Sequence, residues 1–133
     1  MLDWIFQGAQ PAKWFPARAA AVGVEIRDHH PSGRVLTLAP VWPLAGGLGV
    51  FPEFATAPFA WRNAPFVPPE RRQRLKLIAP TDLESFLAAQ APPAILTGVE
   101  DEDLEVPLVT YARSHGYRMV KLKRKRELWL PPQ

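Results

Sequence analysis

The chain of 133 residues is 47% hydrophobic and 22% charged, which predicts one globular domain with a hydrophobic core and argues against disorder. It has no cysteine, so disulfides and thiolate zinc sites are excluded. Its net charge of +3 is small, and its 16 prolines predict short elements joined by rigid connections.

The N-terminal third is expected to hold a lead-in, one helix and one strand. Residues 1–13 are interpreted as a linker, and residues 14–133 as a single α/β domain. A helix over 14–30 is predicted by apolar residues at helical spacing, namely Ala19, Val22 and Ile26. The nearly continuous apolar run 34–39 is typical of a strand that is buried on both faces.

The middle of the chain, residues 41–74, is predicted to be mostly irregular, with a short strand over 48–51. Its segment 51–62 alternates aromatic and small side chains with prolines, which interrupt the hydrogen bonding of helices and strands. So much aromatic surface in an irregular segment predicts packing over a site or a partner. The candidate contact residues are Phe51, Glu53, Phe54, Phe59, Trp61 and Arg62.

Glu53 is the best candidate for a catalytic carboxylate, because it stands alone among apolar residues. Arg62 would then hold an anionic group of a substrate. The competing interpretation joins Glu53 and Arg62 in an ion pair that only fixes the segment. We expect the ion pair and assign no catalytic residue, because no second carboxylate, histidine or nucleophile is close in sequence.

A second helix and a second buried strand are predicted in the next stretch. Thr81 and Glu84 match the capping-box pattern at the start of a helix. Pro92 and Pro93 end this helix, and residues 94–97 are short and apolar, as expected of a buried strand.

The last part of the chain predicts a third helix and a hairpin. Pro107 is expected in the first turn of the helix, and Gly116 just beyond its end. Residues 117–122 and 127–130 then predict two antiparallel strands joined by a Lys-Arg-Lys-Arg turn.

Three helix-to-strand units predict a small, Rossmann-like layered α/β domain with a mostly parallel central sheet and a C-terminal antiparallel hairpin. Loops that follow parallel strands share the carboxyl edge of the sheet, where open α/β sheets bind ligands. The N-terminal lead-in and the loops after residues 39, 97 and 122 are therefore expected to meet at one edge.

Charge is concentrated in two blocks near the C-terminus. Five acids lie within 100–105, and six basic residues lie within 118–126. Such blocks usually form solvated faces, and a basic hairpin tip can also keep an edge strand from pairing with another chain. The alternative is contact with anionic lipid headgroups, for which the candidates are Lys121, Lys123, Arg124, Lys125 and Arg126. Nucleic acid is not favoured, since only Tyr117 and Trp129 flank this run.

No metal, cofactor or membrane span is predicted. The glycines of 46–49 do not have the spacing of a nucleotide-binding loop, and a flexible turn accounts for them better. His29 and His30 point in different directions at a helix end, with His115 far away in sequence, so no metal site is expected. The uncharged run 35–52 contains prolines and glycines that suit a strand and a loop better than a spanning helix.

Most of the chain resembles the soluble C-terminal domain of certain bacterial membrane glycosyltransferases of the GT-C class, relatives of the protein mannosyltransferases and aminoarabinose transferases. Patterns of packing and turn residues carry the resemblance, in segments 14–39, 43–47, 52–62, 93–98, 104–108, 111–112 and 116–117. Ala57 departs from the pattern, since a glycine is expected there.

The resemblance implies a parent enzyme that transfers sugar from a polyprenyl-phosphate donor. Its catalytic residues would lie in a membrane-embedded domain of the same parent chain, so none is assigned here. This chain would be an extracytoplasmic accessory domain that contacts the membrane, the glycan or lipid-linked acceptor, or the catalytic domain. Two competing hypotheses remain open: a stand-alone soluble enzyme or ligand-binding domain with a site at Glu53 and Arg62, and a polyanion-binding module that uses residues 121–126.

Overall fold

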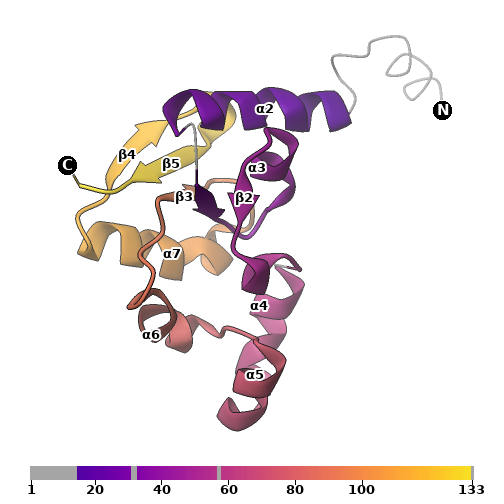
Figure 1. Ribbon diagram of the computed structural model, residues 1–133, viewed down its shortest axis with the longest axis vertical. Helices are drawn as coiled ribbons and strands as arrows, with labels where there is room; N and C mark the ends of the chain where they lie inside the picture. Colours follow the sequence, from indigo (N-terminus) through magenta and orange to yellow (C-terminus); the bar gives the residue numbers. More distant parts are fainter. Residues whose placement is uncertain (1–14, 31–32, 57, 133) are drawn as a thin grey trace, which may run out of the picture.

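The computed structural model describes residues 15–30, 33–56 and 58–132, and the predicted lead-in 1–13 lies outside them. It has a mixed α/β fold around one five-stranded sheet (Figure 1). The strands lie in the order β2-β1-β3-β5-β4. Their bounds are β1 (Arg34–Leu36), β2 (Gly49–Val50), β3 (Ala94–Thr97), β4 (Arg118–Lys121) and β5 (Glu127–Leu130).

The sheet is mixed rather than purely parallel. β1 pairs in parallel with both β2 and β3, whereas β5 pairs antiparallel with both β3 and β4. The predicted C-terminal antiparallel hairpin is confirmed. Two antiparallel steps make β4 point the same way as β3, so β1, β2, β3 and β4 all end at one edge of the sheet. We call this the carboxyl edge.

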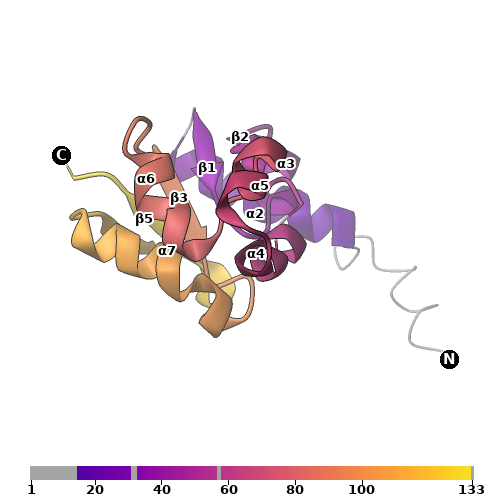
Figure 2. The same cartoon turned by 90° about the horizontal axis from the view of Figure 1, so that it is seen from below.

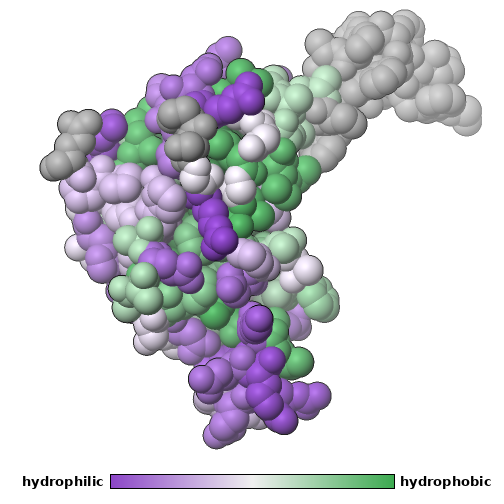
Figure 3. Space-filling view, in the orientation of Figure 1, coloured by the Kyte–Doolittle hydropathy of each residue, from purple (hydrophilic) through white to green (hydrophobic). Residues whose placement is uncertain are grey.

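Helices lie on both faces of the sheet (Figures 1 and 2). α2 lies on one face and α7 on the other, while α5 forms a hydrophilic protrusion at the bottom of Figure 3. The helices are α2 (Phe15–His29), α3 (Val41–Ala45), α4 (Phe59–Asn63), α5 (Pro69–Leu75), α6 (Leu83–Leu87) and α7 (Glu102–Ser114).

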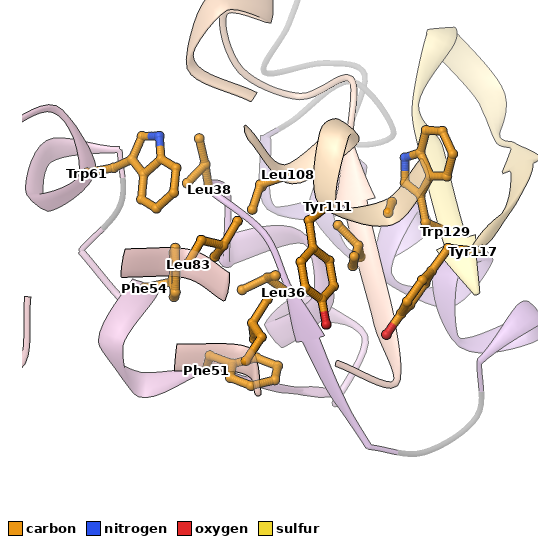
Figure 4. Close-up of a cluster of buried hydrophobic side chains, with 13 residues drawn as sticks. Leu36, Leu38, Phe51, Phe54, Trp61, Leu83, Leu108, Tyr111, Tyr117 and Trp129 are labelled. Carbon is orange, nitrogen blue, oxygen red and sulfur yellow. The ribbon is translucent and has the colours of Figure 1, made fainter. Parts of the chain in front are cut away.

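The core is divided by the sheet into two clusters, because successive strand residues point to opposite faces. In β1, Val35 faces the α2 cluster and Leu36 faces the α7 cluster. In β5, Leu128 faces the α2 cluster, and Trp129 joins the aromatic cluster of Figure 4. β1 and β3 are buried on both faces, as the apolar runs 34–39 and 94–97 predict.

The prediction that residues 41–74 are mostly irregular is wrong, because they form three short α-helices and two 3-10 turns. The prolines explain the difference. Pro52, Pro65 and Pro69 each occupy the first or second position of a helical turn, where the missing N–H costs nothing. They therefore start short helical turns.

The predicted capping box of Thr81 and Glu84 is also wrong. Thr81 lies inside a 3-10 turn, and Asp82 closes that turn by accepting a 3.0 Å hydrogen bond from the backbone N–H of Ala79. Glu84 instead lies 3.0 Å from Nε2 of His115. An aspartate one position away thus takes the capping role.

Of the two predictions for the third helix, one is confirmed. Gly116 has a φ of 75°, and the N–H groups of Gly116 and Tyr117 bond back to Arg113 and Ala112 in a Schellman motif. Pro107, however, lies in the second turn, because α7 begins at Glu102. The helix starts earlier than proline placement suggests.

The glycine run contributes to close helix packing. A Cβ on Gly46 would lie 2.4 Å from the backbone of Gly23, so α2 and α3 touch through their backbones. Gly47 has a φ of 79°, in the left-handed region that favours glycine. The glycines at 46 and 47 are thus explained by packing and by backbone conformation.

Candidate functional site

The carboxyl edge brings together segments that are far apart in sequence, as predicted. Arg62 of α4 lies 3.3 Å from Asp101 in the acidic loop that follows β3. The basic turn, residues 123–126, lies against the same loop, because a Cβ on Gly98 would be 2.5 Å from the carbonyl oxygen of Lys125. The backbone N–H of Lys123 also donates to Glu25 of α2 at 3.2 Å.

The basic turn has a strained backbone. Arg124 and Lys125 have φ values of 58° and 64°, and the Arg126 N–H points back at the carbonyl of Lys123 at 3.5 Å. Two successive positive φ angles are the pattern of a type I′ turn, which favours Asn-Gly. Each non-glycine residue in this conformation costs about 1–2 kcal/mol. The chain thus places two cations where other residues are more stable.

Between α2 and the basic turn lies a cavity of about 210 Å³, which we call the basic groove. Arg18, Lys123, Arg124 and Arg126 supply four cationic groups, against one carboxylate. The full lining is Arg18, Ala21, Val22, Glu25, Lys123, Arg124 and Arg126. Sequence reasoning missed Arg18, although the predicted arrival of the first helix at this edge was the signal that could have found it.

Arg126 forms the inner wall of the groove. Its guanidinium lies 4.9 Å from the centre of the Trp42 ring, and its Nη1 donates to the carbonyl of Lys123 at 3.2 Å. Burial, followed by the nearby charge of Arg124, lowers the pKa of Arg126. The arginine pKa is high enough that the groove keeps this charge at neutral pH.

Two of the predicted lipid contacts do not line this groove. Lys121 is exposed on β4, opposite Glu127 in the strand register. Lys125 is exposed on the other side of the turn, where it lines a cavity of about 430 Å³ that also includes Glu100, Glu102 and Glu105. The basic turn therefore faces the groove with Lys123, Arg124 and Arg126, and faces the acidic loop with Lys125.

Glu105 organises the acidic loop. Its side chain is 4% exposed and accepts hydrogen bonds from the backbone N–H groups of Gly98, Val99 and Glu100 at 2.9, 3.4 and 3.3 Å. Burial raises the pKa of Glu105, while these three donors act to lower it. The N–H groups that follow β3 are thus occupied by the chain's own carboxylate, and Glu105 holds the loop in place.

The aromatic segment divides into a buried and an exposed part. Phe51, Phe54 and Trp61 are 2%, 2% and 3% exposed and belong to the core, where Figure 4 shows all three. A contact role for these three is therefore corrected, since their rings are covered by α6 and its neighbours. Phe59 is 73% exposed and stays a contact candidate.

Glu53 and Arg62 do not form the predicted ion pair. Arg62 is paired with Asp101, and Oε2 of Glu53 is buried without a hydrogen-bond donor among the described residues. The reason is the short helix α4, which directs Arg62 toward the acidic loop. The predicted ion pair is therefore wrong, while the stand-alone enzyme hypothesis stays a prediction.

The three histidines have different surroundings. His29 is exposed at the end of α2, and Nε2 of His30 is buried without a partner among residues 15–30, 33–56 and 58–132. Desolvation lowers the pKa of His30. His115 stacks on Tyr111 with ring centres 4.1 Å apart. Within the described ranges, no group of three or more potential ligands is placed to hold a metal ion.

Comparison with known proteins identified no relative: no family model, no curated protein and no solved structure matches the chain. In the part of the chain that the structure describes, no helix has both the length and the apolar character needed to cross a bilayer.

Proposed function

We propose that this chain is the extracytoplasmic accessory domain of a bacterial membrane glycosyltransferase that uses a polyprenyl-phosphate sugar donor. Its carboxyl edge would face the anionic lipid headgroups and the membrane-embedded catalytic domain of the same parent chain. The domain would not be catalytic alone. We also infer a Rossmann-like arrangement of its layers, which is supported by helices on both faces of the sheet.

The basic groove is the observation that carries this proposal. It gathers cations from α2 and from the β4–β5 turn, and one of them, Arg124, has a left-handed backbone conformation. Non-glycine residues that are held in the left-handed region cluster at functional sites. A lipid phosphate supplies the negative charge that such a groove attracts.

Sedimentation with lipid vesicles tests the proposal. The substitutions R124N/K125G remove one cation that lines the groove and one from the other side of the same turn. They install the residues that the turn geometry prefers, so the fold is kept. Each cation near an anionic surface contributes about 1 kcal/mol, so we expect binding to vesicles rich in anionic lipid to fall about 30-fold. R118S is the control for the loss of a surface charge, because Arg118 is exposed and begins β4 at the opposite edge of the sheet.

Equal binding of R124N/K125G and the unaltered chain would contradict the lipid contact. Preferential binding to nucleic acid, with an affinity that falls linearly with log salt concentration, would support the polyanion-binding module instead.

A further inference from the structure

We infer that α4 and the 3-10 turn that follows it, Ala64–Phe66, form an anchor that inserts Phe59 and Phe66 into the membrane interface. This inference rests on the proposed membrane-facing carboxyl edge and names the part of that edge that enters the lipid. The two phenylalanines are the most exposed large hydrophobic residues described, at 73% and 86%.

Spacing places the two rings on one face. Residues 59–66 form a continuous helical stretch, in which positions 59, 62, 63 and 66 follow the i, i+3, i+4, i+7 pattern of a single helix face. The opposite positions, Ala60, Trp61 and Ala64, are buried. The outward face, where polar residues are expected, thus carries two phenylalanines around one arginine. We call this face the aromatic stripe.

Hydrogen bonds and ring packing hold α4 in a fixed position on the core, so its outward face has a defined orientation. Trp61, below the stripe, donates from Nε1 to the carbonyl of Leu104 at 3.0 Å and packs on Phe54 with ring centres 5.5 Å apart. Asn63 donates to the carbonyl of Phe59 at 2.8 Å. The buried tryptophan fixes α4 against the core while Phe59 points outward.

The protruding helix α5 is anchored beside the stripe. Arg72 bonds to Asp82 at 2.9 Å and to the carbonyl of Val67 at 2.7 Å, so it is used internally. In contrast, Arg71 and Arg74 are exposed, with no ion pair to any of the described residues. Lys76 ends the helix with a φ of 56°, again a cation where glycine is favoured.

The charge of α5 favours an anionic occupant on its side of the stripe, whereas on the other side Arg62 faces Asp101, Glu102 and Asp103. Hydrophobic atoms border the hydrophilic α5 protrusion in Figure 3, and exposed cations on α5 outnumber its single acid, Glu70. Exposed aromatic rings beside arginine and lysine are the composition of segments that lie in the headgroup region of anionic bilayers. α4 follows β2 and contacts the acidic loop through Arg62, so the stripe belongs to the carboxyl edge.

The test separates apolar insertion from electrostatic attraction. Sedimentation with anionic vesicles is measured across a salt titration, because high salt screens the cations and leaves the apolar contribution. F59S/F66S should lower the binding that persists at high salt by about tenfold or more, whereas F59L/F66L should keep it. V24S/V106S is the control, since Val24 and Val106 are exposed at 42% and 50% on other helices.

A monolayer of the same anionic lipid provides the second readout, in which the unaltered chain should raise the surface pressure and F59S/F66S should not. If F59S/F66S sediments and inserts like the unaltered chain, the inference is overturned, and a protein partner becomes the occupant of the stripe. If R124N/K125G alone loses binding, the proposed lipid contact stands without this anchor. If the unaltered chain binds no vesicle at all, both the proposed lipid contact and the proposed anchor are wrong.

Discussion

The acidic loop and the basic turn look alike in sequence as short runs of charge, but the fold uses them in opposite ways. Glu105 is buried under three backbone donors, and Asp101 is paired with Arg62. Arg124 and Lys125 are exposed, and within the described ranges neither forms an ion pair. Two acids of one block thus have partners within the chain, whereas these two cations have no oppositely charged partner among the described residues, as the proposed lipid contact requires.

Removing the Glu105 carboxylate should have the largest effect on folding. E105A leaves three backbone N–H groups at the start of the acidic loop without an acceptor, and we expect a loss of about 3 kcal/mol in the free energy of unfolding. Urea denaturation measures it, with E105Q as the milder variant that keeps one acceptor oxygen. A change of less than 1 kcal/mol in E105A would contradict the structural role of this carboxylate.

Separating the two charged segments should have the next largest effect. G98A places a Cβ 2.5 Å from the carbonyl oxygen of Lys125 at a residue whose φ is 82°. We expect the free energy of unfolding to fall by about 2–3 kcal/mol, of which left-handed strain accounts for about 1–2 kcal/mol. G47A is the matched control, because Gly47 has a similar φ of 79° and the nearest atom would be 3.8 Å away. Equal losses in both variants would mean that the two loops do not touch.

The substitutions in the basic turn should change stability and vesicle binding in opposite directions. R124N/K125G relieves the left-handed strain, so the free energy of unfolding should rise by about 1 kcal/mol while vesicle binding falls. Thermal denaturation and sedimentation on the same preparation measure both quantities. A decrease in stability would show that these side chains support the fold, and the contrast with the acidic loop would be lost.

Removing the exposed ion pair should have the smallest effect on the free energy of unfolding. Arg62 and Asp101 are 54% and 76% exposed, so D101A should change the free energy of unfolding by less than about 0.5 kcal/mol. Urea denaturation alongside E105A makes the comparison direct. A loss as large as that of E105A would assign this pair a structural role that its exposure does not suggest.

Elements with strong local signals were predictable from the sequence. Apolar periodicity and Gly116 marked α2, β3, the end of α7 and the hairpin, because burial on both faces and a left-handed cap leave few alternatives. The carboxyl edge followed from the alternation of helices and strands along the chain. Residues 41–74 were not predictable, since proline interrupts a helix but also starts one, and only tertiary contact decides which.

The candidate site was predicted only in part, for a related reason. The cations of the basic turn were visible as a run, but Arg18 joins them through the packing of α2. The split of the aromatic segment depended on helical phase within 59–66, which Pro58 and Pro65 obscured. The pairing of Arg62 with Asp101, 39 positions away, is a long-range contact that local sequence does not specify.

The most direct test of the central claim is an immunoblot of fractionated source cells with an antibody raised against this domain. If the accessory-domain proposal is right, the antibody detects a species much larger than 14.9 kDa that is confined to the membrane fraction. A small species of this mass in the soluble fraction would contradict the accessory-domain proposal, and the search for function would then return to Glu53 and its surroundings.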